Sequence, residues 1–129
     1  MTVSFNISTY IPATPDEIYR TWMDSDGHSA MTGSPARIES TPGASFEAWD
    51  GYITGVNLEL EPGRRILQSW RTVEFNPEEP DSRLEVLLEP EGDGTRLTLR
   101  HTRLPAHGQQ YENGWHENYF DPMRAYFSE

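Results

Sequence analysis

The sequence predicts an α+β fold: a curved antiparallel β-sheet of about seven strands wraps around a long C-terminal α-helix, with two short helices after the first strand. Two observations predict this arrangement. Apolar and polar residues alternate over residues 3–10 and in further segments between residues 36 and 102, as in half-buried strands. Aromatic residues then recur every four positions near the C-terminus, which is the spacing of one helix face.

The first helix begins after the strand at residues 3–10. Thr14 occupies the capping position, Pro15 the first helical position, and Glu17 stands three residues after the cap. This order satisfies free backbone amides at a helix start, so we expect a helix from Pro15. Asp24 to Gly27 is expected to end it, and Ser29 to Met31 suggests a second, short helical turn.

Strand-like alternation dominates the middle of the chain, interrupted by turn residues. Asp50-Gly51 is typical of a tight hairpin turn, and the loop from Asn76 to Ser82, which contains two prolines, is expected to lie outside the sheet. The expected strands after the helices are Ala36–Glu39, Ser45–Ala48, Tyr52–Leu60, Arg65–Thr72, Arg83–Glu89 and Arg96–Thr102.

A long helix is expected from about His107 to Phe127. Its inner stripe consists of residues spaced by four: Tyr111, Trp115, Tyr119 and Met123. Pro122 lies within this segment and lacks an amide hydrogen. We therefore expect a kink there, or a break with Asp121 capping a last short turn.

Length and composition limit the functions that the protein can have. At 129 residues the chain is predicted to be one domain, 1–129, and its net charge of −11 opposes binding to nucleic acid. All ten basic residues are Arg, and Cys is absent, so lysine and thiolate chemistry are excluded. No segment has the length and hydropathy of a membrane span or a signal peptide, so we expect a cytoplasmic protein with no membrane partner and no cofactor.

Several segments resemble the carboxy-terminal domain of the activator of heat-shock-protein-ninety ATPase and its stand-alone bacterial relatives, within the START-like (Bet v-like, SRPBCC, helix-grip) superfamily. The resemblance covers nearly the whole chain, and the C-terminal aromatic residues are its most specific part. It is carried by Thr14–Tyr19, Pro42–Phe46, Asp50-Gly51, Gly55, Leu60–Ile66, Ser69–Arg71, Gly94–Leu99, Gly114-Trp115, Tyr119-Phe120 and Phe127.

This resemblance implies a cavity between the sheet and the last helix, often used for apolar small molecules, and does not imply one activity. The eukaryotic activator has a separate amino-terminal domain that holds the chaperone, and nothing in these residues corresponds to it. A chaperone partner therefore stays an alternative rather than the expectation. Many relatives also carry a Trp pair where this chain has Ala30 to Gly33, so the pocket entrance is expected to differ.

Strand alternation indicates which side chains face the cavity. Inward positions are expected at Tyr52, Val56 and Leu58 on one strand, Leu84, Val86 and Leu88 on another, and Leu97, Leu99 and His101 on the last. His101 is the polar member, and it either orients a ligand or acts in acid–base chemistry, or is a histidine at the sheet rim bonded to backbone.

The candidate ligand-binding residues are mainly aromatic. Trp70, Trp115, Tyr119 and Met123 either line the cavity or pack as core, and Gln68 either shares the inner face with Trp70 or points outward. No metal site is expected. Asp24 to His28 lacks the glycine and glutamate spacing of a calcium loop, and the histidines lack the spacing of a zinc helix.

Three functions remain open, and binding of a ligand without catalysis is the preferred one. The domain binds a small apolar molecule without catalysis, so no catalytic residue is assigned. Alternatively it is a cyclase-type or hydrolase-type enzyme that uses the same cavity, or a chaperone-related protein-interaction module. An enzyme would need a polar pocket residue with a strongly shifted pKa.

Overall fold

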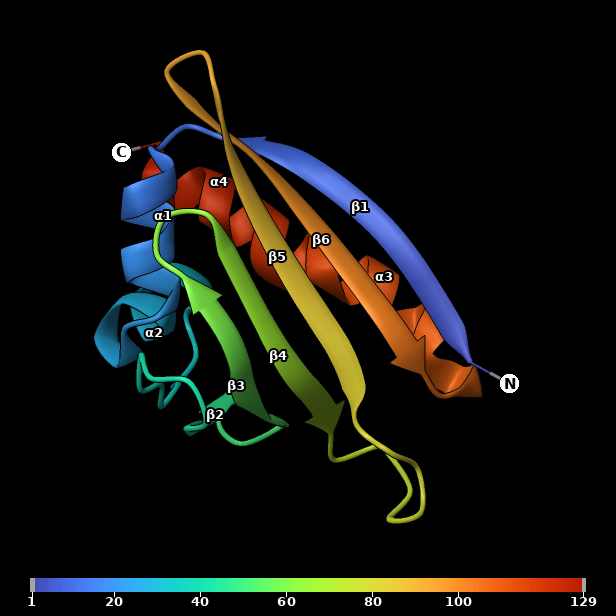
Figure 1. Ribbon diagram of the computed structural model, residues 1–129. Coiled ribbons are helices and arrows are strands. Elements are labelled where there is room, and N and C mark those ends of the chain that lie inside the picture. Colours follow the sequence, from blue (N-terminus) through green and yellow to red (C-terminus); the bar gives the residue numbers. More distant parts are fainter. Residues whose placement is uncertain (1, 129) are drawn as a thin grey trace.

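The computed structural model describes residues 2–128 and has an antiparallel sheet as its largest layer (Figure 1). Within these residues the sheet has six strands in the order β1-β6-β5-β4-β3-β2. The strands are β1 (Val3–Ile11), β2 (Ser45–Ala48), β3 (Ile53–Glu61), β4 (Arg65–Thr72), β5 (Ser82–Glu91) and β6 (Gly94–Leu104).

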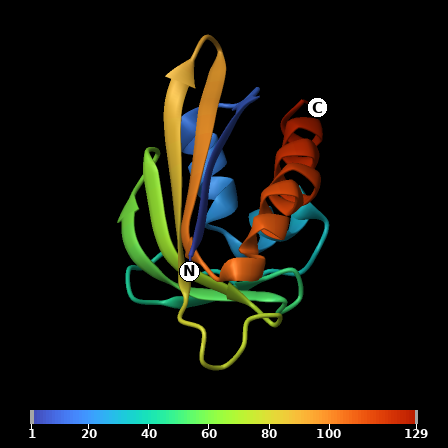
Figure 2. The ribbon, with the colours of Figure 1, turned by 90° about the vertical axis from the view of Figure 1, so that its right-hand side faces the viewer.

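The C-terminal helical segment forms the second layer across the concave face of the sheet (Figure 2). It begins with a 3-10 turn at Ala106–Gln109 and continues through α3 (Gln110–Trp115), a π-helical turn at His116–Phe120, and α4 (Asp121–Phe127). The predicted α+β architecture, with a long C-terminal helix held by a curved sheet, is therefore confirmed.

Six strands are present where about seven were expected, because residues 36–39 do not form a strand. Arg37 makes one isolated bridge to Glu47. The backbone of Ile38 instead forms two hydrogen bonds with the Ser25 side chain. Its N–H donates to Ser25 Oγ at 2.8 Å, and its carbonyl accepts from the same hydroxyl at 3.1 Å. A serine on a helix thus takes the place of a neighbouring strand.

Both short helices follow β1. Helix α1 (Pro15–Trp22) starts where predicted, with the Glu17 amide donating to Thr14 Oγ1. Helix α2 (Ser25–Thr32) is longer than the single turn expected. The Asp24 carboxylate accepts the Gly27 amide at 2.8 Å, so Asp24 caps a new helix instead of only ending the first.

Pro122 is accommodated without a break in the last helical segment. The π-helical turn lies immediately before it, and Asp121 has helical backbone angles of −64° and −50°. A wider turn tolerates the missing proline amide. The predicted inner stripe is confirmed as buried, since Tyr111, Trp115, Tyr119 and Met123 are each at most 7% exposed.

The inward faces of β5 and β6 follow the predicted alternation. Leu84, Val86 and Leu88 are buried on β5, and Leu97, Leu99 and His101 on β6.

On β3 the predicted alternation is wrong: Leu58 is 38% exposed, whereas Asn57 is fully buried. A register shift between Asn57 and Glu59 marks a β-bulge. Asn57 is stable inside because its amide donates to the Glu39 and Thr41 carbonyls and accepts from Gln68 Nε2.

Among residues 2–128, none of the helices combines the length and apolar character needed to cross a bilayer.

Candidate functional site

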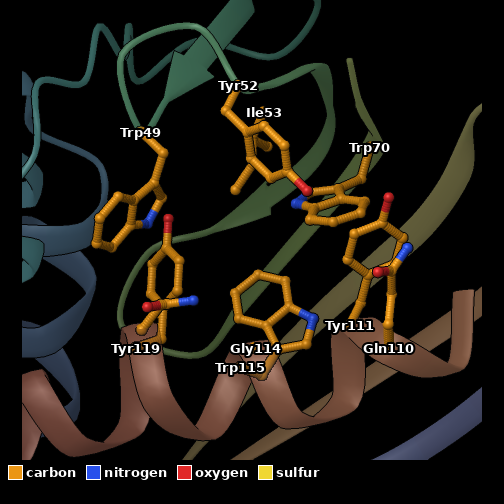
Figure 3. Close-up of a pocket in the computed structure, with 10 residues that line it drawn as sticks. Trp49, Tyr52, Ile53, Trp70, Gln110, Tyr111, Gly114, Trp115 and Tyr119 are labelled. Carbon is orange, nitrogen blue, oxygen red and sulfur yellow. The ribbon is translucent and has the colours of Figure 1, made fainter. Parts of the chain in front are cut away.

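A pocket of about 380 Å³ lies between one end of the sheet and the C-terminal helical segment (Figure 3). Its sheet side is formed by the turn after β2, the start of β3 and the end of β4, and its helix side by α3 and the π-helical turn. The lining residues are Trp49, Tyr52, Ile53, Trp70, Gln110, Tyr111, Gly114, Trp115, Asn118 and Tyr119.

Aromatic rings in mutual contact form most of the wall. The Trp115 ring centroid lies 5.7 Å from that of Trp70 and 4.7 Å from that of Tyr119. Tyr111 meets Trp70 edge-on at 5.0 Å. Such offset and edge-to-face contacts stabilise a fixed wall in addition to the area they bury. The four-residue spacing along the helix places Tyr111, Trp115 and Tyr119 together on one side.

His101 lies behind this wall and fixes the Trp115 indole. Trp115 Nε1–H donates to His101 Nδ1 at 3.0 Å, so the ring proton of His101 lies on Nε2. Nε2 donates to Ser82 Oγ at 2.9 Å, and that hydroxyl donates to the Trp70 carbonyl at 2.7 Å. Burial lowers the pKa of His101 to about 3, so the imidazole is neutral.

Tyr119 is held in the same way by a histidine of α2. Its hydroxyl donates to His28 Nε2 at 2.7 Å, and His28 Nδ1 donates to the Trp22 carbonyl at 2.9 Å. Burial lowers the pKa of His28 to about 4 and raises the pKa of Tyr119 well above its ordinary value. Both groups are therefore neutral near pH 7, and the phenol keeps its proton.

Trp49 enters the pocket from a turn with unusual backbone geometry. Trp49, Asp50 and Gly51 have φ angles of 54°, 57° and 87°. A left-handed conformation is ordinary for glycine and uncommon for a bulky aromatic residue. The predicted tight turn at Asp50-Gly51 is present, and it directs the Trp49 indole toward Tyr119 (Figure 3).

Glu74 bridges the sheet and the helix at the rim of the pocket. Its carboxylate accepts hydrogen bonds from the Tyr52 hydroxyl and, at 3.5 Å, from Gln110 Nε2. Burial, followed by this carboxylate, raises the pKa of Tyr52 well above its ordinary value.

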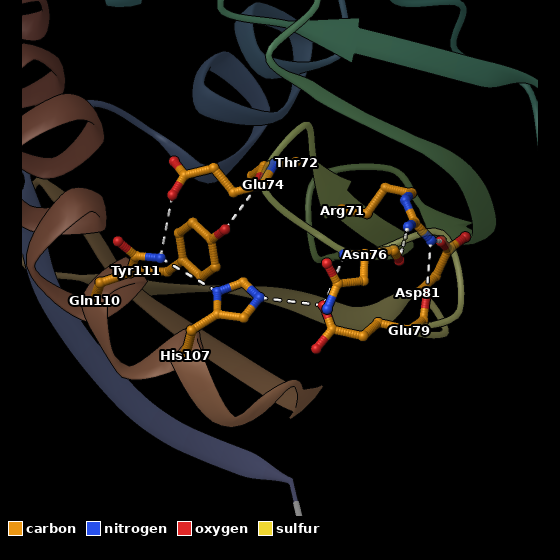
Figure 4. Close-up of polar contacts among 9 residues, drawn as sticks. All are labelled: Arg71, Thr72, Glu74, Asn76, Glu79, Asp81, His107, Gln110 and Tyr111. Atoms are coloured by element: carbon orange, nitrogen blue, oxygen red, sulfur yellow. Dashed lines mark hydrogen bonds and ion pairs between the residues drawn. The ribbon is translucent and has the colours of Figure 1, made fainter.

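A second link at the rim runs through His107, which contacts Gln110 and the Glu79 carboxylate, each at 3.3 Å (Figure 4). The loop from Asn76 to Ser82 is thereby joined to the start of the helical segment. Of this loop, only Ser82 lies in a strand, at the start of β5.

No charged side chain belongs to the lining of this pocket. The polar groups that it contains are hydroxyls, amides and indole N–H groups, which suit a neutral ligand with few hydrogen-bonding atoms. Among residues 2–128, no group of three or more His, Asp or Glu side chains gathers to hold a metal ion.

Three of the six residues predicted from sequence line the pocket: Trp70, Trp115 and Tyr119. The other three lie outside the lining. His101 sits behind Trp115, Gln68 is buried with its amide bonded to Asn57, and Met123 is fully buried core. All six side chains are at most 3% exposed, so the alternation that indicated burial could not separate the wall from its support.

Sequence reasoning missed several lining residues. Tyr111 was placed on the inner helix stripe without being assigned to the site, and Gln110, Gly114 and Asn118 flank that stripe. Trp49 had no signal in strand alternation because it lies in a turn. Its neighbour Asp50-Gly51 was the available indication that the Trp stands at a sharp reversal of the chain.

An open antiparallel sheet that holds a long C-terminal helix, with a pocket between them, defines the helix-grip class of α+β domains. Residues 12–128 match the family described as Activator of Hsp90 ATPase homolog 1-like protein, and the chain belongs to this family.

A relative in Mus musculus, Activator of 90 kDa heat shock protein ATPase homolog 1, is 27% identical over 114 residues. That alignment covers 88% of this chain and 33% of the relative, so the chain spans about a third of the relative's length.

Two solved structures support the assignment of the fold. An HSP90 activator from Plasmodium falciparum superposes with a TM-score of 0.88 at 21% identity, covering 97% of this chain and 96% of that one. CalU16 from Micromonospora echinospora superposes with a TM-score of 0.80 at 28% identity, covering 97% and 76%.

Proposed function

We propose that this domain binds a small, neutral, largely apolar molecule in the pocket between β3, β4 and the C-terminal helical segment. The observation that carries the proposal is the lining itself, in which six of ten residues are aromatic and none is charged. A volume of about 380 Å³ falls within the roughly 300–1,000 Å³ typical of small-molecule sites.

The residues have two different roles in this proposal. Trp70, Trp115 and Tyr119 contact the ligand with their ring faces and edges. His101 acts as a positioning residue through its hydrogen bond to the Trp115 indole. Gln68 and Met123 support the sheet face and the helix from behind, where both are buried.

The test uses Gly114, which lines the pocket and has free space beside it. Apart from the two neighbouring residues and the backbone of the same helix, the nearest atom to a Cβ at this position would be Asn118 Nδ2, at 3.8 Å. Gly114→Leu therefore fills the pocket from the helix without entering the packed core. Ala125→Leu adds a leucine at an exposed position of α4 and serves as the matched control.

The probe is N-phenyl-1-naphthylamine, a neutral apolar dye whose fluorescence rises in a dry site. We expect saturable binding to the wild type and to Ala125→Leu, and at least tenfold weaker binding to Gly114→Leu. No saturable binding to the wild type, or equal binding to Gly114→Leu, would contradict the proposal. Native mass spectrometry of the protein from its own cells then gives the mass of the bound molecule.

A second candidate is a chaperone-related interaction module, favoured by the family and by the relatives named as ATPase activators of the 90-kDa heat shock protein. The surface gives it less support. The exposed large apolar side chains of the described residues are Tyr10, Leu58, Val73 and Tyr126, which lie on four separate parts of the chain. Stimulation of the ATPase of a purified 90-kDa chaperone from the same organism by this chain would favour the module.

The enzyme alternative has weaker geometric support. Both buried histidines use both ring nitrogens in protein hydrogen bonds, so neither presents a free nitrogen to the pocket. Two lining residues, Tyr52 and Tyr119, have strongly raised pKa values, and their hydroxyls already donate to Glu74 and His28. The cytoplasmic location and the absence of nucleic acid partners stay predictions from sequence.

A further inference from the structure

The two edges of the sheet differ in length and in cover. β2 forms one edge with four residues, and its outer side is bridged to Arg37. The Arg37 amide donates to the Glu47 carbonyl at 2.9 Å, and the Glu47 amide donates to the Arg37 carbonyl at 3.0 Å. β1 forms the other edge with nine residues. Figure 1 shows β1 along the border of the sheet, with no segment of the chain beyond it.

The outer edge of β1 is open for pairing with another strand. Within residues 2–128, β1 pairs with β6 alone, and no backbone hydrogen bond joins residues 3–10 to any other segment. Natural proteins usually block an open edge with charged side chains, proline or a bulge in the edge strand. β1 has no charged residue and no proline, and the one irregularity in its pairing adds the extra residue to β6.

The lack of charge distinguishes β1 from the rest of the sheet. Each of the other five strands of residues 2–128 contains Arg or Glu, and the whole chain has a net charge of −11. Two molecules with this charge repel one another when they approach through most surfaces. The edge of β1 lets a second copy approach without placing charge against charge, and it offers no charge that would attract a charged segment of another protein.

The two faces of β1 carry different side chains. Val3, Phe5 and Ile7 are partly buried, because they pack against the core from the concave face at the open border of the sheet. The alternate side chains lie on the opposite face and are exposed: Ser4, Asn6 and Ser8. A strand that paired with β1 would therefore cover apolar area on one face and meet small, uncharged groups on the other.

The chemistry of β1 is symmetric about Asn6. An apolar residue stands on each side of it, Phe5 and Ile7, and a serine stands beyond each of these, Ser4 and Ser8. An antiparallel second copy centred on Asn6 would place Phe5 opposite Ile7 and Ser4 opposite Ser8. Aromatic side chains opposite β-branched ones, and hydroxyls opposite hydroxyls, stabilise a strand pair. The strand is thus complementary to itself, as a two-fold interface requires.

We propose that two copies of this chain pair through the open edges of β1, antiparallel and about a two-fold axis at Asn6, so that their sheets become continuous. Val3, Phe5 and Ile7 of each copy then meet their counterparts on the concave face and bury most of their remaining exposed area. The pairing covers residues 3–9, about 20 Å of strand. An interface of this size is typical of weak association, so we expect a dissociation constant in the micromolar range.

Sedimentation velocity of three proteins tests the dimer. Asn6→Lys places two like charges opposite each other at the axis, although it reduces the net negative charge of each chain by one. Asn76→Lys makes the same substitution at an exposed residue of the loop between β4 and β5, and it is the matched control. Far-UV circular dichroism checks that both variants are folded.

We expect the wild type and Asn76→Lys to reach twice the mass of the 14.8-kDa chain as the concentration rises to about 500 µM. Asn6→Lys should dimerise at least fivefold more weakly. A wild type that stays monomeric at this concentration overturns the inference and leaves the edge to a strand of another protein. An Asn6→Lys variant that dimerises as tightly as Asn76→Lys also overturns it.

Cysteine trapping tests the register without adding charge. The chain has no Cys, so Asn6→Cys introduces a single thiol, and the two-fold axis places it opposite its own counterpart. Diamide, a thiol oxidant, then joins the two thiols as a disulfide. Ser8→Cys is the matched control on the same face of β1. In this register it lies opposite Ser4 of the second copy, and its two thiols are about 13 Å apart.

We expect the disulfide-linked dimer of Asn6→Cys to form at least tenfold faster than that of Ser8→Cys. Denaturing electrophoresis without reductant measures both rates. Equal rates would overturn the two-fold pairing at Asn6. These outcomes are independent of the pocket, because none of the tested residues lines it.

Discussion

His28 and His101 are neutral imidazoles that hold two pocket aromatics in fixed orientations. His28 accepts the Tyr119 hydroxyl from one side, and His101 accepts the Trp115 N–H from the other. Each histidine donates its own proton to protein, to the Trp22 carbonyl and to Ser82 Oγ. The two rings therefore set the wall of the pocket without entering it, which is a positioning role.

Replacing Gly114 and Gly55 by alanine is expected to change the free energy of unfolding in opposite directions. We expect Gly114→Ala to raise the free energy of unfolding by about 1 kcal/mol, because alanine is favoured over glycine in a helix and the site has free space. Gly55→Ala should lower it by about 3 kcal/mol. Its Cβ would overlap the Ser69 carbonyl oxygen and would lie 2.6 Å from the Phe46 ring.

Urea unfolding monitored by tryptophan fluorescence measures both effects. Thr54→Ala, at an exposed position beside Gly55, is the control and is expected to change the free energy of unfolding by less than about 0.5 kcal/mol. Equal stabilities for Gly55→Ala and Thr54→Ala would show that β3 and β4 separate easily at this point.

Among the elements, the C-terminal helix was predictable because its signal is local and redundant. Four large residues at successive spacings of four leave one helix face for the core, and all four are buried. The segment at residues 36–39 carries the same alternation as a strand, but a distant Ser25 hydroxyl bonds its backbone. No local pattern contains that information.

The residues in and near the pocket differ in how far the sequence could predict their positions. Trp70, Trp115 and Tyr119 were predictable from periodicity because they belong to regular elements. Alternation that turns Val56 and Leu58 inward predicts the opposite face for Asn57, yet its amide forms hydrogen bonds inside the protein. Trp49 depends on a left-handed turn, whose direction is set by tertiary contacts.

Ser25→Ala tests the bond between α2 and the segment at residues 36–39. The substitution leaves the Ile38 N–H and carbonyl without their partner, and Ile38 is 8% exposed. We expect a loss of about 2 kcal/mol in the free energy of unfolding, together with faster amide exchange at Ile38. Hydrogen exchange followed by NMR measures the local effect.

Ser4→Ala, at an exposed position of β1, is the control for the Ser25 substitution. It should leave the Ile38 exchange rate unchanged. An Ile38 amide that stays as protected in Ser25→Ala as in the wild type would mean that another group replaces the hydroxyl, and the account of the missing strand would then be incorrect.

At the scale of the whole molecule, the two buried histidines couple stability to pH. Their pKa values are about 4 for His28 and about 3 for His101, against an ordinary value of 6.5. At pH values between the folded pKa and the ordinary pKa of 6.5, each histidine binds a proton in the unfolded chain but not in the folded protein. Stability from both groups is therefore fully present above pH 6.5 and is lost as the pH falls toward the folded pKa values.

We expect His101→Gln to weaken the pH dependence of unfolding. Each histidine contributes a loss of about 1 kcal/mol between pH 7 and pH 5.5, because a pKa difference of one unit corresponds to about 1.4 kcal/mol. Urea unfolding at the two pH values gives the loss for each variant. His101→Gln and His28→Gln should each lose about 1 kcal/mol less than the wild type over this interval.

His116→Gln separates this effect from the titration of the acidic surface. His116 is partly exposed on the π-helical turn, so its replacement removes a histidine without removing a buried one. The free energy of unfolding that His116→Gln loses between the two pH values should equal the loss of the wild type. A wild-type loss that all three variants share would instead place the pH sensitivity in the carboxylates, because the chain carries 21 acidic residues against ten Arg.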